Sequence, residues 1–139
     1  MTRSPRGLVD TNVLILIDQI DPADLPAEIL VSAITMAELA AGPHHTHDPA
    51  ERASRIERLQ HAEALFEPLA FGTDAARRYG HVVAAVLAAG RQERPRRIDL
   101  MIASIASVHR LPLFTVNTDD FAGLEGLVEV HPVTHPVDR

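Results

Sequence analysis

The sequence predicts an α/β fold, in which a central parallel sheet is covered by helices on both faces to give a three-layer α/β/α domain. Short apolar runs alternate with longer amphipathic stretches along the whole chain, which is typical of successive strand–helix–strand units. The apolar runs are bounded by residues that favour turns. The length of 139 residues fits a single domain, 1–139, whose core we expect to span about 7–133.

The first part of the chain predicts a strand and then a helix. Residues 7–12 read as a short buried strand with a turn, and Asn12 tolerates turn geometry. The pattern of residues 13–20 is helical, and Pro22 and Pro26 interrupt it. We therefore expect one strand and one short helix before the chain turns back.

The middle of the chain predicts a second strand followed by two helices. The strand is expected at 29–33 and a helix at 35–41, which Gly42 and Pro43 would end. Residues 49–64 have the periodicity of an amphipathic helix.

The last part of the chain repeats this alternation. We expect a brief extended segment at 66–71, followed by a long helix at 73–89 that Gly90 ends. A basic connector at 91–97 leads to a further helix at 98–109. Two strands are expected last, at 111–116 and 127–133.

Four acidic residues are far apart in the chain, yet each stands where an expected element begins or ends. Asp10 ends the first strand, Glu38 is one turn into a helix, Asp99 opens a helix, and Asp119 follows a strand. In a parallel sheet these places share one edge, where ligands bind. Carboxylates gathered there repel one another unless a cation lies between them. We therefore predict a divalent-metal site and phosphate-ester chemistry.

Each acid also has a structural alternative. Asp10 could form an Asx-turn, and Glu38 could complete a capping box with Thr35. Asp99 could simply complement a helix dipole. Asp119 and Asp120 could be solvated loop acids. We choose Asp119 over Asp120 as the fourth acid, with Asn117 as a neutral ligand of metal or water.

Composition excludes several classes of protein. There is no cysteine, which rules out disulfides and thiolate zinc sites and is compatible with the cytosol. The longest apolar stretch, 13–17, is far too short to span a membrane, so a cytoplasmic protein without a membrane contact is expected. All 13 basic residues are arginine, so no mechanism can use lysine.

Arginine is well suited to gripping phosphate oxygens, which an acidic site would otherwise repel. Arg91, Arg94, Arg96 and Arg97 precede Asp99 and are our candidates for gripping the phosphates of a substrate, although pairing with local acids is an equal alternative. A second set on one helix side is more easily explained as a solvated face or a partner surface: Arg52, Arg55 and Arg58. Three loop histidines with Asp48 could suggest zinc, but a flexible polar loop is favoured: His44, His45 and His47.

The order and spacing of the acidic motifs resemble those of PIN-domain ribonucleases, and in particular the VapC toxins of bacterial type II toxin–antitoxin pairs. The resemblance covers residues 7 to about 133. It rests on four segments: Leu8-Val9-Asp10-Thr11-Asn12-Val13-Leu14, Thr35-x-x-Glu38-Leu39, Arg97-Ile98-Asp99-x-x-Ile102-Ala103 and Thr115-Val116-Asn117-Thr118-Asp119-Asp120-Phe121.

The resemblance implies a PIN-like fold, RNA cleavage that depends on Mg²⁺ or Mn²⁺, a VapB-type antitoxin partner, a homodimer and a toxin–antitoxin hetero-oligomer. By position, Asp10, Glu38 and Asp99 match the three core acids of the family. The family's fourth acid falls at the position of Asn117 or two residues later, which makes Asp119 the candidate. Further residues of these motifs are expected to support the site: Asn12, Thr115 and Asp120.

The expected roles follow from the preference of Mg²⁺ for oxygen ligands and retained waters. Asp10 and Asp99 would bind the ion, Glu38 would orient a water, and Asp119 with Asn117 would form a weaker second position. The water would attack the RNA phosphate in line. A non-catalytic interaction module stays open as the alternative. A haloacid-dehalogenase-like phosphatase is less favoured, because Asn12 stands where that motif requires a second acid.

Overall fold

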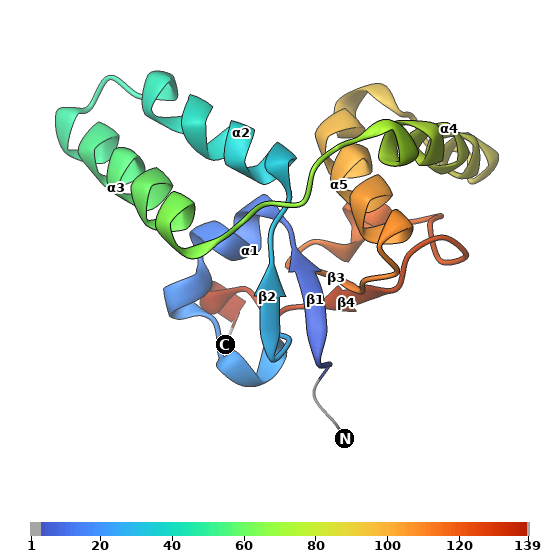
Figure 1. The fold of residues 1–139 in the computed structure, drawn as a ribbon, viewed down its shortest axis with the longest axis horizontal. Helices are drawn as coiled ribbons and strands as arrows, with labels where there is room; N and C mark the ends of the chain where they lie inside the picture. Colours follow the sequence, from blue (N-terminus) through green and yellow to red (C-terminus); the bar gives the residue numbers. More distant parts are fainter. Residues whose placement is uncertain (1–3, 139) are drawn as a thin grey trace.

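The computed structural model describes residues 4–138 and contains a four-stranded sheet (Figure 1). The strands are β1 (Arg6–Val9), β2 (Glu28–Leu30), β3 (Leu113–Thr115) and β4 (Val130–Pro132). Their order in the sheet is β2–β1–β3–β4, and every neighbouring pair is parallel. The chain adds β2 on one side of β1 and later β3 on the other, so the strand order reverses between β1 and β3. Ligands of open α/β sheets bind at such a point, beyond the carboxyl ends of the strands.

Helices cover the sheet in two groups, which Figure 1 shows apart from each other. One group contains α2 and α3, with α1 close to the sheet, and the other pairs α4 with α5. The bounds of the five helices are α1 Thr11–Ile15, α2 Ala33–Ala41, α3 Pro49–Leu65, α4 Thr73–Ala88 and α5 Arg97–Val108.

Two hydrophobic cores lie on the two faces of the sheet. Leu8 of β1 and Leu113 of β3 belong to the core that α4 and α5 cover. Their neighbours Val9 and Phe114 belong to the other core, which includes Val13 of α1. This alternation follows from the strand geometry, in which successive side chains point to opposite faces. The expected three-layer α/β/α architecture is confirmed.

The boundaries of the elements differ from the expected ones in ways that matter for the site. The helix expected from residue 35 begins at Ala33, because the Ser32 hydroxyl accepts a hydrogen bond of 3.0 Å from the Thr35 N–H and so caps it. Glu38 therefore lies in the second turn, out of reach of the helix N-terminus. The alternative role of Glu38, a capping box with Thr35, is therefore wrong. Residues 66–71 pair only at Leu69, through a parallel bridge to Ser32.

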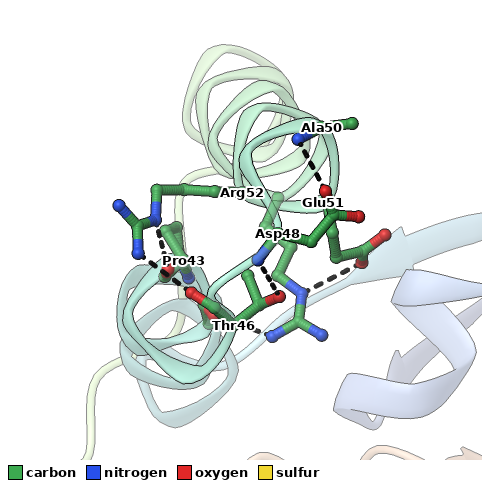
Figure 2. A network of polar contacts seen from close by, with 8 residues as sticks. Pro43, Thr46, Asp48, Ala50, Glu51 and Arg52 are labelled. Atoms are coloured by element: carbon green, nitrogen blue, oxygen red, sulfur yellow. Dashed lines mark hydrogen bonds and ion pairs between the residues drawn. The ribbon is translucent and has the colours of Figure 1, made fainter.

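The turn between α2 and α3 is held by two arginines (Figure 2). Arg52 donates hydrogen bonds to the carbonyl oxygens of Pro43 (3.2 Å) and Thr46 (2.9 Å). Arg55 donates to the Gly42 carbonyl (2.8 Å) and pairs with Glu51 (3.0 Å). These two side chains thus fasten a helix hairpin, and Arg52 is at the same time exposed, as the solvated face favoured by the sequence requires.

The histidine loop that follows α2 is exposed at its histidines and at Asp48. Asp48 caps α3 instead, by accepting a hydrogen bond of 3.2 Å from the Ala50 N–H (Figure 2). No zinc-like cluster forms there within residues 4–138. In the same part of the chain, no helix combines the length and the apolar character needed to cross a membrane.

Candidate active site

Asp10 is the buried centre of the site. It follows β1 directly and is only 6% exposed. Its Oδ1 accepts a hydrogen bond of 3.0 Å from the Val13 N–H, so the residue also caps α1. Burial raises the pKa of its carboxyl group, as do the charges of Asp120 and Glu38, while hydrogen bonds from Thr115 and Val13 lower it. The burial of a carboxylate beside other carboxylates is costly without a compensating cation.

Glu38 is hydrogen-bonded to Thr11, the residue that follows Asp10. The Thr11 hydroxyl donates a hydrogen bond to Glu38 Oε1 and lies 3.0 Å from the hydroxyl oxygen of Thr35. This small network links the first turn of α1 to α2 and holds the glutamate, whose charge acts on the carboxyl group of Asp10. Sequence reasoning missed Thr11. The available signal was a hydroxyl next to the acid that ends the first strand.

Asp99 enters the site from the first turn of α5. Burial is the main cause that raises the pKa of its carboxyl group to about 6, followed by the charges of Asp120, Asp10 and Glu38. The positive charge of Arg96 acts in the opposite direction. Four acids from four different segments are thus close enough for their charges to interact.

The loop after β3 separates the two aspartates that the sequence could not tell apart. Both lie in the 3₁₀ helix η5 (Thr118–Phe121). Asp120 is partly buried, and its charge raises the pKa values of both Asp10 and Asp99. The side chain of Asp119 is 73% exposed and forms ion pairs with Arg91 and Arg96 instead. The geometry therefore favours Asp120 over Asp119, the reverse of our choice from the sequence.

The remaining expected residues divide into a buried group and an exposed group. Thr115 is fully buried, and its hydroxyl bonds to Asp10 and accepts from the Asn117 N–H at 3.0 Å. Asn117 is exposed, and its carbonyl oxygen accepts from the Asp120 N–H at 3.2 Å. Asn12 is exposed, and its side chain has no hydrogen bond or ion pair within residues 4–138. Thr115 and the backbone of Asn117 thus position acids of the site.

The four candidate arginines differ in their partners. Arg91 and Arg96 face Asp119, whereas Arg97 pairs with Glu93 at 3.7 Å. Arg94 is exposed and unpaired among the described residues. Pairing with local acids, the alternative that the sequence left open, therefore applies to three of the four.

The acids form an electrostatic cluster rather than a closed cage. Among residues 4–138, no three histidine, aspartate or glutamate side chains are near enough to enclose a metal ion by themselves. Such a cage is not what Mg²⁺ requires, because this ion keeps several waters and usually takes one or two carboxylates plus substrate oxygens. Oxygen donors with raised pKa values and mutual repulsion fit a hydrated divalent cation.

Comparisons with known proteins agree with this geometry. The model of the PIN domain matches residues 7–127. Ribonuclease VapC5 of Mycobacterium tuberculosis is 34% identical over 132 residues, which is 93% of this chain and 95% of that protein.

Solved structures give the same picture. The VapBC-5 toxin–antitoxin structure from Mycobacterium tuberculosis has a TM-score of 0.79 and 32% identity, and the match covers 93% of this chain and 98% of that chain. A toxin–antitoxin complex from Klebsiella pneumoniae has a TM-score of 0.62 and 28% identity over 94% of this chain and 97% of that one.

Proposed function

Since the chain belongs to the PIN domain family, we propose that it is an endoribonuclease that depends on Mg²⁺ or Mn²⁺ and acts as the toxin of a VapBC-type toxin–antitoxin pair. The similarity to a named ribonuclease over nearly the full length of both chains supports the activity. The observation that carries the proposal is the convergence of Asp10, Glu38, Asp99 and Asp120 where the strand order reverses.

We assign Asp10 and Asp99 as the ligands of the cation, with Asp120 as the fourth acid in place of Asp119. Bound there, a divalent cation supplies a Lewis acid for the phosphate and lowers the pKa of water. Asp10 is held by Val13 and Thr115, so its position is fixed before substrate arrives. Glu38 is held by Thr11. In that place it could orient an attacking water or accept a proton from it.

The RNA backbone needs positive charge beside these acids, because phosphates and carboxylates repel each other. Four candidate arginines lie at or just before the start of α5 and could bind the RNA backbone: Arg91, Arg94, Arg96 and Arg97. Of these, Arg94 and Arg97 are exposed. With few aromatic side chains in the chain (4%), we expect recognition through the backbone and shape of the RNA rather than through base stacking.

The proposed partners are an RNA substrate and a VapB-like antitoxin, the second because the solved relatives include toxin–antitoxin complexes. A homodimer, a toxin–antitoxin hetero-oligomer and a location in the cytoplasm stay predictions.

RNA cleavage by the purified protein tests the proposal. We expect cleavage with Mg²⁺ or Mn²⁺, none with EDTA, and a loss of at least about 100-fold in the Asp10→Asn variant, which keeps the shape of the side chain but not its charge. Glu129→Gln is the matched control, because Glu129 is 74% exposed and outside the acid cluster. Cleavage that survives both EDTA and Asp10→Asn would contradict the proposal. A folded protein without any cleavage would favour the non-catalytic interaction module.

A further inference from the structure

Asp119 makes a contact that its neighbours in the loop do not make. Arg91 Nη1 donates to its Oδ1 at 3.3 Å and Arg91 Nη2 to its Oδ2 at 3.1 Å. Arg96 Nη2 lies 3.8 Å from the same Oδ2. Two parallel contacts between a guanidinium and two acceptor oxygens are the geometry with which arginine also binds phosphate.

The charges and hydrogen bonds in this contact are not balanced. Two guanidinium groups share one carboxylate, so within this contact the two positive charges outnumber the single negative charge. In addition, Arg96 Nε is buried without a hydrogen-bond partner among the described residues. Only 24% of the Arg91 side chain and 22% of the Arg96 side chain are exposed, against 73% of Asp119. The arginines are therefore the fixed members and the aspartate the one most open to displacement.

The contact is also weak enough to be exchanged. Ion pairs with an exposed member contribute about 0 to 1 kcal/mol, because solvent screens them and side-chain entropy opposes them. A phosphate group carries an equal or larger charge and can satisfy the same guanidinium fork.

The contact lies next to the acid cluster. Asp119 directly precedes Asp120, and Arg96 stands three residues before Asp99 and acts on its charge. A single strand whose scissile phosphate lies at the acids would bring an adjoining phosphate to the arginines.

We propose that Arg91 and Arg96 form a second phosphate site for the RNA backbone beside the scissile bond, and that Asp119 occupies this site until RNA displaces it. Asp119 is then an internal competitor that lowers the affinity for RNA and is not a catalytic residue. The inference rests on the proposed ribonuclease function, since it places RNA at the neighbouring acids.

The test is the affinity for a fluorescent single-stranded RNA, measured by anisotropy in EDTA so that no cleavage occurs. We expect Asp119→Asn to bind about 3- to 10-fold more tightly than the unmodified protein. Glu129→Gln removes a charge of the same sign from a residue of similar exposure in the same groove, and it should change the affinity less than twofold. Arg91→Met should weaken binding and reduce the slope of log affinity against log salt by about 0.7, which corresponds to one lost phosphate contact.

A combined variant separates a local site from a general effect of charge. If Asp119 competes for Arg91, the gain from Asp119→Asn should largely disappear in the Arg91→Met background. An equal gain in both backgrounds, or an equal gain from Glu129→Gln, would overturn the proposal. Unchanged or weaker RNA binding by Asp119→Asn would also overturn it. If the thermal midpoint of that variant were lowered as well, the contact would be purely structural.

These outcomes are independent of the proposed activity. Cleavage by the unmodified protein with no gain in affinity for Asp119→Asn would remove only the competitor role. Absence of cleavage with Mg²⁺ or Mn²⁺ would instead remove the proposed function.

Discussion

Burial and the charges of Asp120, Asp10 and Glu38 raise the pKa of Asp99 from 3.8 to about 6. A carboxyl group with a higher pKa in the folded than in the unfolded state favours the fold while it is protonated. The free energy of unfolding therefore falls as pH rises from about 4 to about 6. Above pH 6 the ionised Asp99 lowers the stability of the fold by its full amount.

For the metal-free protein, we therefore expect Asp99→Asn to be stabilising at pH 7.5. One pKa unit corresponds to about 1.4 kcal/mol, and after solvent screening of this partly exposed group the expected gain is roughly 1 to 2 kcal/mol. Urea denaturation in EDTA at pH 7.5 and at pH 4 measures it, and most of the gain should be lost at pH 4. A less stable Asp99→Asn protein at pH 7.5 would mean that the carboxylate makes a favourable contact without any cation.

The same pKa predicts how activity depends on pH. If Asp99 binds the cation as we propose, the cation must compete with protons for it, so below about pH 6 cleavage at limiting Mg²⁺ should fall about tenfold for each pH unit. Saturating Mg²⁺ should move the midpoint of the profile to lower pH. A profile that does not respond to the Mg²⁺ concentration would separate Asp99 from metal binding.

The neighbouring aspartates give a second contrast between single residues. We expect Asp120→Asn to lower kcat by about 10- to 100-fold, because it removes an acid of the cluster. Asp119→Asn should instead act on KM and lower it. Steady-state cleavage of one RNA by both variants measures this, and a large loss of kcat in Asp119→Asn with none in Asp120→Asn would restore the assignment made from the sequence.

At the scale of single elements, β1 reaches its position through a close approach to β3. A Cβ atom on Gly7 would overlap the Phe114 ring, so the strand needs glycine at this position. We expect Gly7→Ala to destabilise the fold by about 1 to 3 kcal/mol through overpacking. In α4, a Cβ atom on Gly80 would meet no atom within 4 Å, and Gly80→Ala should stabilise by about 0.5 to 1 kcal/mol. Urea denaturation measures both changes, and equal effects of the two variants would contradict this packing.

Elements also show what the sequence could and could not predict. Helical periodicity placed α3, α4 and α5 within a residue or so, because their apolar stripes repeat over several turns. The start of α2 was misjudged because Ser32 and Thr35 can each cap a helix, and only the packed structure chooses between them. In η5, successive residues point in directions about 120° apart, so adjacent acids differ in role without a difference in sequence.

At the scale of the molecule, the acids come from the end of β1, where Asp10 caps α1, from α2, from α5 and from the loop after β3. Their positions in the sequence predicted a common edge because strand ends and helix starts meet there in any parallel sheet. The hydrogen bond from Thr11 to Glu38 and the ion pairs of Asp119 could not be predicted, since they depend on side chains that meet only after folding.

Because those segments span most of the chain, a cation among them should stabilise the whole fold. We expect Mn²⁺ at 100 times its dissociation constant to add about 2.7 kcal/mol to the free energy of unfolding, and EDTA to remove it. Asp10→Asn should abolish the gain, whereas Glu129→Gln should keep it. Thermal denaturation with and without Mn²⁺ measures the difference, and an equal gain in Asp10→Asn would place the ion elsewhere.

We propose that the distant carboxylates of the chain hold one divalent ion at the edge where the strand order reverses. Anomalous diffraction from a crystal soaked in Mn²⁺ would locate that ion. We predict a peak within coordination distance of Asp10 and Asp99, either directly or through water, on the side of Asp120 and away from Asp119. A peak at another place, or none among these acids at full Mn²⁺ saturation, would contradict the account.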